Sequence, residues 1–196
     1  LCAFYPSPFA FGTAGGSAIL WLSSEHGAIL VTDNILEQYA VDGAIDEVVA
    51  PVWYDCSAEA PRRPEFTVKN AVERVAKLKP KGIGYEPSTA PAALIDGLRA
   101  PLTNIEPALL AMRRRKDEYE LALMRRAMRA GANALDTARR ETTPGTTELE
   151  VYDLLYSTAC QDTGEPVLMY GDILSGRRCL QVGGFATERR IESGDP

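Results

Sequence analysis

Short apolar runs separated by polar loops make up the first half of the chain. Residues 18–22 and 28–32 are apolar, and they flank a loop, residues 23–27, that ends in glycine. Two such runs joined by a short loop containing glycine predict a β-hairpin. Residues 47–54 are rich in valine and aromatic side chains and predict a third strand, in which Pro51 indicates an edge or a bulge.

A helical spacing of apolar positions follows the loop at residues 61–64. The buried face that it predicts consists of Val68, Ala71, Val72, Val75 and Leu78. A short strand over residues 83–86, a short helix over 91–98 and a further strand over 102–105 come next. A hairpin followed by this alternation predicts a mixed sheet covered by helices.

The second half opens with a long helix-forming stretch that begins near Pro107 and continues through Arg140. Its apolar positions predict one buried stripe, in which we expect the two methionines to pack in the core: Leu121, Met124, Met128, Gly131, Leu135 and Ala138. A helix of this length has about five turns or more.

Residues 143–145, Thr-Pro-Gly, end that helix, and a second one follows. Thr147 and Glu150 form a capping box, in which each side chain accepts a hydrogen bond from the other residue's backbone N–H. The expected inner face of this helix consists of Leu149, Tyr152, Leu155, Tyr156 and Ala159. Gly164 and Pro166 end it, and residues 167–174 and 178–182 are strand candidates.

The pattern therefore predicts two domains. Residues 1–108 form an α/β domain with a mixed sheet, and residues 109–196 form the first part of an α+β domain that opens with long helices. The chain starts at Leu1 rather than at a methionine and stops at Pro196, directly after a predicted turn. We therefore expect it to be a piece of a longer protein.

The amino-acid composition argues against several classes of partner. The 196 residues carry 21 Lys and Arg against 27 Asp and Glu, a net charge of −6, which argues against a nucleic acid or an anionic membrane as partner. No segment resembles a signal peptide or a membrane span. The four cysteines are far apart in the sequence, and no two of them form a CxxC motif. This spacing fits a cytoplasmic protein.

The single histidine, His26, excludes a site built from several histidines within these residues. It falls in the predicted hairpin loop, where we expect it to be an exposed turn residue. Cys160 and Cys179 lie on apolar patterns and are expected to be buried core thiols.

Three motifs occur in the second half in a set order: Arg113 to Glu120 ahead of the long helix, Pro144 to Glu148, and Ser175-Gly176-Arg177 followed by Gly183 to Asp195. Together they resemble the entry to the pita-bread domain of the creatinase and X-Pro aminopeptidase family, which includes prolidase. The resemblance covers residues from about 106 to 196. Residues 1 to about 105 resemble the creatinase-type N-terminal domain of that family in pattern only.

The resemblance implies a metal-dependent hydrolase of C–N bonds. In the family, two Asp, one His and two Glu hold two divalent metal ions, Mn²⁺, Co²⁺ or Zn²⁺, and the bridging hydroxide attacks the substrate. The family pattern puts the first ligand a few residues beyond Pro196, so Asp195 counts as a turn residue. We therefore expect the pita-bread domain to be truncated before its ligands, with no catalytic residue, metal ligand or bound metal in this chain.

The substrate implied by the family is a small X-Pro peptide or a related amide, and a homodimer is expected for the full-length form. Gly183 and Gly184 stand where many members carry a histidine followed by glycine. These two glycines and Tyr170 are the candidate substrate-binding residues, and Arg177 is a further candidate. Because Gly183 replaces that histidine, one alternative is a family member without catalysis that acts as a binding or chaperone-like module. A second alternative, a plain α/β ligand-binding domain, requires the motif match over residues 113–195 to be a coincidence.

Overall fold

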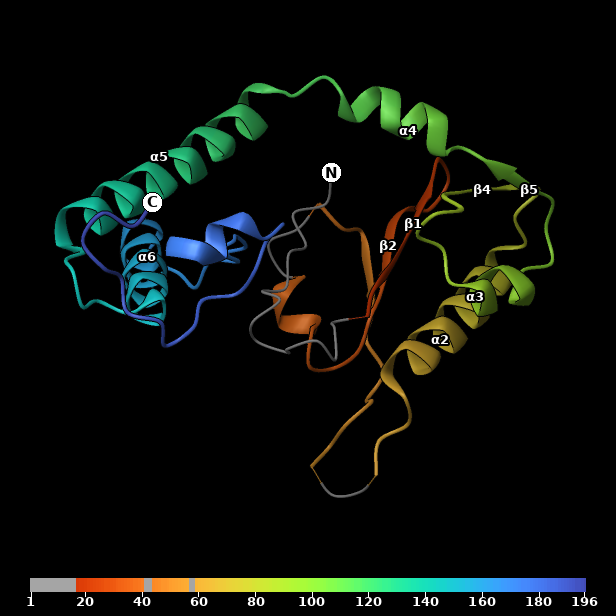
Figure 1. Ribbon diagram of the computed structural model, residues 1–196. Coiled ribbons are helices and arrows are strands. Elements are labelled where there is room, and N and C mark those ends of the chain that lie inside the picture. The colour runs from red at the N-terminus through yellow and green to blue at the C-terminus, as the bar shows by residue number, and fades with distance from the viewer. Residues whose placement is uncertain (1–16, 41–43, 57–58) are drawn as a thin grey trace. The chain divides into compact units, whose positions relative to one another are not determined.

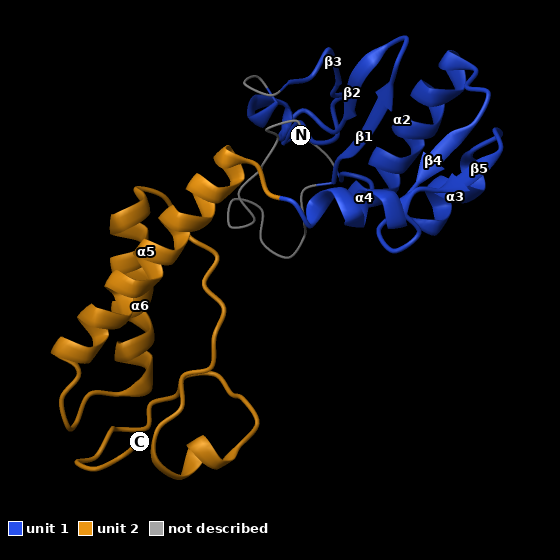
Figure 2. Ribbon diagram, turned by 90° about the horizontal axis from the view of Figure 1, so that it is seen from above, with its two compact units in different colours: residues 1–115 blue, residues 116–196 orange. Residues whose placement is uncertain are grey.

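The computed structural model describes residues 17–40, 44–56 and 59–196 (Figure 1). The chain divides into two compact units, Leu1–Arg115 and Lys116–Pro196 (Figure 2). The boundary expected after residue 108 falls inside helix α4, Glu106–Arg113, which belongs to the first unit.

The predicted hairpin is confirmed in the first unit. Strands β1, Ile19–Ser23, and β2, Gly27–Val31, pair antiparallel with Ile19 opposite Val31. Strand β3, Glu47–Val49, pairs parallel to β2, so that β2 is the central strand. Ala28 to Val31 of β2 are buried. The third strand is shorter than predicted because it stops before Pro51, which has no N–H to donate to a sheet.

Helix α2, Arg63–Leu78, buries the apolar face that its spacing predicts. Val68 and Ala71 of α2 form a core cluster with Val31 of β2 and with Leu94. Leu94 lies in helix α3, Ala92–Gly97. The sheet, α2 and α3 therefore share one core, and the helix and strand alternation predicted from the sequence is confirmed for residues 63–104.

Strands β4, Ile83–Tyr85, and β5, Leu102–Asn104, pair parallel on either side of α3 in the chain. They form a two-stranded sheet of their own, whereas the sequence pattern predicted one mixed sheet. Side-chain packing rather than backbone hydrogen bonds joins the two sheets. Trp21 of β1 packs against the second core cluster, which includes Val75, Ile83 and Leu98.

The second unit contains a pair of packed helices, α5, Glu118–Glu141, and α6, Glu148–Thr163. The predicted Thr147–Glu150 capping box is present at the start of α6, and Asp117 and Glu120 form a second one at the start of α5. The capping box of α5 explains why the helix-forming stretch is divided between α4 and α5. Its capping residue, Asp117, adopts non-helical backbone angles and so interrupts the helix.

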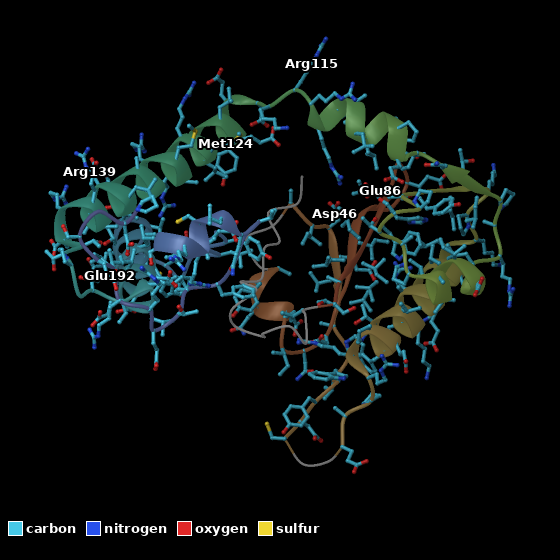
Figure 3. All side chains as sticks on the ribbon, in the orientation of Figure 1. Asp46, Glu86, Arg115, Met124, Arg139 and Glu192 are labelled. Atoms are coloured by element: carbon cyan, nitrogen blue, oxygen red, sulfur yellow. The ribbon has the colours of Figure 1, made fainter. Side chains whose placement is uncertain are left out.

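Small side chains line the contact between α5 and α6. Ala130, Ala134 and Ala138 of α5 are buried, as is Ala159 of α6. The predicted apolar stripe is wrong for its largest members, because Met128 and Leu135 are 73% and 66% exposed and Met124 also projects from α5 into solvent (Figure 3). On α6, Leu149 and Tyr152 are exposed as well. Alanines permit close helix approach, so the contact does not use the larger side chains.

The predicted strands over residues 167–174 and 178–182 are also wrong. The described backbone has no strand in this segment, and a short 3-10 helix, η3, spans Gly176–Leu180. A strand needs a ladder of backbone hydrogen bonds to a neighbour. Among the described residues, no backbone hydrogen bond joins the two stretches, and the first stretch makes one such bond to a later residue, from Ile173 N to Gly184 O at 3.3 Å.

An ion pair between helix α2 and the sheet makes the first unit sensitive to acid. Arg74 Nε donates to Glu47 Oε1 at 2.7 Å, and this hydrogen bond holds the pKa of Glu47 below its usual range. A carboxylate with a lowered pKa in the folded state stabilises the fold at neutral pH and loses that contribution as the pH falls through the acidic range. The pair is partly exposed, so its contribution is at most about 1 kcal/mol.

We therefore expect Glu47→Gln to lower the free energy of unfolding at pH 7 and to reduce the loss of stability between neutral and acidic pH. Urea unfolding at several pH values, followed by tryptophan fluorescence, measures both effects. Glu73→Gln, which changes an exposed carboxylate of helix α2 next to Arg74 in the chain, is the matched control. An identical pH profile for native protein and Glu47→Gln contradicts the prediction.

Candidate functional site

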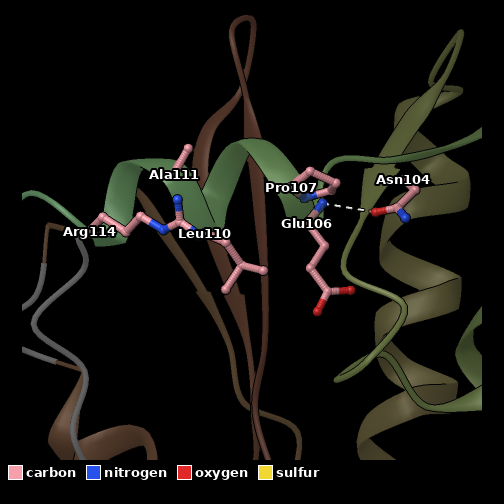
Figure 4. A pocket seen from close by; sticks show the side chains of 6 residues that line it. All are labelled: Asn104, Glu106, Pro107, Leu110, Ala111 and Arg114. Atoms are coloured by element: carbon pink, nitrogen blue, oxygen red, sulfur yellow. Dashed lines mark hydrogen bonds between the residues drawn. The ribbon is translucent and has the colours of Figure 1, made fainter.

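The first unit has an open depression beside helix α4, with a volume of about 330 Å³ (Figure 4). Leu110, Ala111 and Arg114 line it together with Asn104, Glu106 and Pro107. The Glu106 N–H donates to Asn104 Oδ1 at 2.9 Å, which fixes the start of the helix. None of the residues predicted to bind substrate lies here, and within the described part of the chain no group of three His, Cys, Asp or Glu could hold a metal ion.

The second unit contains a buried carboxylate. Glu148, in the first turn of α6, is 0% exposed. It accepts hydrogen bonds from the backbone and hydroxyl of Ser175, at 2.8 and 2.7 Å, and from the backbone and hydroxyl of Thr187, at 3.0 and 2.7 Å. Arg178 of η3 completes this set by pairing with Glu148 Oε2. The charge is thus held by donors from the segment that follows α6.

A second set of contacts extends this cluster to the end of the chain. Arg189 Nη1 lies 2.6 Å from Ser175 Oγ and 2.6 Å from Asp195 Oδ2. The Arg189 guanidinium holds the pKa of Asp195 below its usual range. Asp195 also accepts from the Glu192 N–H at 2.8 Å. These contacts make it a turn residue in this structure.

Backbone bonds join the same segment to the start of α6. The N–H groups of Glu148 and Leu149 donate to the carbonyls of Arg189 and Thr187, at 3.0 and 3.1 Å. The first N–H groups of a helix have no partner within it. Residues 187–190 supply partners for two of them and so lie along the α6 N-terminus.

Gly183 and Gly184 follow a bend at residues 181 and 182 and lie against the segment that carries Tyr170; this stretch is called the Gly183–Gly184 turn. The Gly184 N–H donates to Asp172 Oδ1 at 2.9 Å. Gly183 has a φ of +89°, a conformation that L side chains rarely adopt, and a Cβ there would lie 3.1 Å from Asp172 Oδ1. Tyr170, two residues before Asp172, is 91% exposed and places its ring in solvent. The structure thus puts the two glycines beside the 170–174 segment, and Arg177 is exposed on η3.

The remaining candidate residues have structural environments. His26 is exposed in the hairpin loop, as predicted. Cys179 is exposed and Cys160 is half-buried, so the expectation of two buried core thiols is wrong. Cys179 lies on the exposed η3 helix, because the strand that would have buried it does not form. Cys2 lies outside the described residues.

The sequence pattern does not reveal the cluster of Glu148, Arg178 and Thr187. Glu148 directly follows the capping threonine of α6, so it resembles the acidic residues common in the first turn of a helix. The only sequence signal for it is its place in the Pro144 to Glu148 motif. Its donors come 27 to 39 residues later in the chain, beyond the reach of any local pattern.

No family model matches the sequence, and no curated protein does. Solved structures do match. An X-Pro aminopeptidase from Thermotoga maritima is 22% identical with a TM-score of 0.72, over 91% of this chain and 47% of that one. A prolidase from Pyrococcus horikoshii is 22% identical with a TM-score of 0.70, over 97% of this chain and 52% of that one.

A prolidase from Pyrococcus furiosus is 21% identical with a TM-score of 0.62, over 86% of this chain and 46% of that one. The chain thus spans about half the length of the solved structures that it matches. It has the fold of the N-terminal part of these X-Pro aminopeptidases and prolidases.

Proposed function

We propose that this chain is the N-terminal part of a hydrolase that cleaves C–N bonds in X-Pro peptides or related small amides. The observation that carries the proposal is the fold likeness to an X-Pro aminopeptidase over 91% of the chain. The order of the three motifs between Arg113 and Asp195 supports it independently. In this proposal residues 116–196 are the first part of a pita-bread domain, and residues 1–115 are a creatinase-type N-terminal domain.

Two divalent metal ions, Mn²⁺, Co²⁺ or Zn²⁺, belong to the proposed activity. The described residues do not fit such a pair, since they contain no suitable group of ligands. We therefore assign the ligands to the half of the matched structures that this chain does not span. No chemical step is assigned to a residue of this chain.

The role left to this chain is to help form the substrate pocket. We propose that Gly183 and Gly184 border it, because two residues without side chains let a peptide approach the backbone closely. Tyr170 presents an exposed aromatic ring one short segment away, and such a ring can cover the apolar ring of a proline. These three residues are the proposed substrate contacts.

A second candidate function is a binding module without catalysis. Gly183 favours it, because family members with a histidine at this position use that side chain at the substrate. The backbone favours it further, since a histidine at a φ of +89° would be strained. The choice between the two functions depends on the activity of the longer protein.

Chelation separates the two candidates. We expect the longer protein that contains this chain to hydrolyse X-Pro dipeptides and tripeptides, to lose this activity to EDTA, and to regain it with Mn²⁺, Co²⁺ or Zn²⁺, because bound divalent metal ions would supply the activation of water that this hydrolysis needs. The assay measures release of the N-terminal amino acid. Peptides with alanine in place of proline are the matched substrates.

Hydrolysis that resists chelation would refute the metal-dependent mechanism. Saturable peptide binding without turnover would support the binding module instead.

The full-length form is proposed to be a homodimer and to reside in the cytoplasm. The thiols of Cys56, Cys160 and Cys179 are free, which fits a reducing compartment. No helix in the described part of the chain is long and apolar enough to cross a membrane.

A further inference from the structure

Glu148 is a fully buried carboxylate that is not needed to cap its own helix. Thr147 caps α6, and the exposed Glu150 completes the capping box. A buried charge is costly unless it is paired and hydrogen-bonded. Glu148 meets this condition through five donor groups, which come from Ser175, Arg178 and Thr187. The carboxylate therefore holds the later segment against α6.

The hydrogen bonds of Glu148 are connected to the Gly183–Gly184 turn through Arg178. While Nη1 of Arg178 pairs with Glu148, its Nη2 donates to the carbonyl of Phe185 at 2.8 Å. The same Nη2 atom lies 3.4 Å from the place where a Cβ of Gly184 would be. A planar guanidinium holds its donors in a fixed geometry. The position of the turn thus depends on where Glu148 holds Arg178.

The hydrogen bonds of Glu148 are also connected to residues 189–195 through Ser175. Ser175 Oγ bonds to Glu148 on one side and to Arg189 on the other, at 2.7 and 2.6 Å. Arg189 in turn bonds Asp195. Residues 167–182 have no β-sheet ladder, so these side-chain contacts hold that stretch. Backbone hydrogen bonds to residues 145–149 also hold residues 187–191.

We propose that Glu148 is a positioning residue: through Arg178 and Ser175 it sets the place of the Gly183–Gly184 turn and of the 189–195 segment on helix α6. Its relevance to substrate rests on the proposed function, which makes this turn part of the substrate pocket. The positioning itself depends only on the contacts within the second unit.

The test compares Glu148→Gln with Glu188→Gln in the 196-residue chain. Glutamine has nearly the shape of glutamate but is neutral, and its amide nitrogen cannot accept the bonds that the second carboxylate oxygen accepts. Glu188 is exposed in the same segment, so its substitution is the matched control. Amide hydrogen exchange and chemical shifts, measured by NMR, report on each residue separately.

We expect the amides of Ser175, Gly184 and Thr187 to exchange at least about tenfold faster in Glu148→Gln, which corresponds to about 1.4 kcal/mol. The Gly183 and Gly184 signals should also shift. The amides of Ala134 and Ala159, in the contact between α5 and α6, should keep their native rates, and Glu188→Gln should resemble the native protein throughout. An unchanged Gly184 amide, or equal acceleration at Ala134 and Ala159, would overturn the proposal.

A second variant covers the case in which Glu148→Gln unfolds the second unit. Arg178→Lys keeps the positive charge but loses the two-pronged contact with Glu148 and the Phe185 carbonyl. The same amides are then compared by the same criteria. The reverse pattern, with loss of protection in α5 and α6 but not at Gly184, would refute the positioning role.

Titration of the chain with an X-Pro dipeptide distinguishes this proposal from the proposed function. If the peptide shifts the Gly183 and Gly184 signals of the native chain, and shifts them less in Glu148→Gln, both proposals are supported. If it leaves the native signals unchanged, the substrate assignment of the turn fails. The exchange data then decide the positioning role by themselves.

Discussion

Asp33→Asn should lower the free energy of unfolding of the first unit by about 3 to 5 kcal/mol, the usual cost of removing one partner of a buried ion pair. Asp33 is 0% exposed, and Arg63 is 6% exposed. Arg63 donates to the two carboxylate oxygens from Nε and Nη2, at 2.6 and 2.8 Å. The neutral amide removes the charge that Asp33 supplies to this buried guanidinium.

The same carboxylate also organises the loop after β2. Asp33 Oδ1 accepts from the N–H groups of Ile35 and Leu36, at 3.0 and 3.3 Å. The guanidinium of Arg63 lies 4.6 Å from the centre of the Trp53 ring. The pair thus joins the end of β2, the start of α2 and the segment around Trp53. Asparagine keeps an acceptor for the loop, so the loss should come mainly from the missing charge.

Urea unfolding followed by tryptophan fluorescence measures this effect. Both tryptophans, Trp21 and Trp53, lie in the first unit, so the signal reports that unit alone. Asp96→Asn, at an exposed position of α3, is the matched control and should change stability by less than about 0.5 kcal/mol. A loss below about 1 kcal/mol for Asp33→Asn would contradict the importance given to the buried pair.

Gly27→Ala should destabilise the first unit by about 2 to 3 kcal/mol, from backbone strain together with a lost hydrogen bond. Gly27 has a φ of +69° at the start of β2. An added Cβ would lie 2.2 Å from Asp46 Oδ2, so the Asp46 side chain must move. That oxygen accepts from the Ala28 N–H at 2.7 Å, and the bond is lost when it moves.

The control for this variant is Gly82→Ala. Its Cβ would meet the Pro101 carbonyl at 3.7 Å, an ordinary contact, and its backbone does not require glycine. We expect it to lie within about 0.5 kcal/mol of the native protein. The urea midpoint by tryptophan fluorescence compares the two variants. Equal midpoints for both would show that neither the turn conformation nor the Asp46 contact contributes as argued.

Local patterns predicted the elements of the first unit well. The hairpin, the buried face of α2 and the strands around α3 depend on residues that are close together in the sequence. The spacing of apolar residues along the chain reports such short separations directly. The Thr147 and Glu150 cap was readable for the same reason. Asp117 and Glu120 show the same capping pattern in the sequence. That pattern predicts the start of a new helix and therefore separate helices α4 and α5.

Periodicity did not reveal which apolar face meets which partner. Met128 and Leu135 fit a buried stripe, yet α5 packs on α6 through alanines. Apolar periodicity marks a face that can be buried, whereas the partner element decides which residues are. The same limit applies to residues 167–182, whose strand-like composition becomes a sheet only beside a strand that supplies a ladder.

The sequence by itself determined the order of helices and strands over residues 19–104, the cap of α6 and the acidic charge, because each depends on nearby residues or on composition. Only the tertiary structure decided that Asp33 meets Arg63, that Glu148 collects its donors from residues 175–187, and that Gly183 and Gly184 turn beside Asp172. These contacts join residues 11 to 39 positions apart. The folded chain brings such residues together through its topology, and no spacing along the chain encodes that topology.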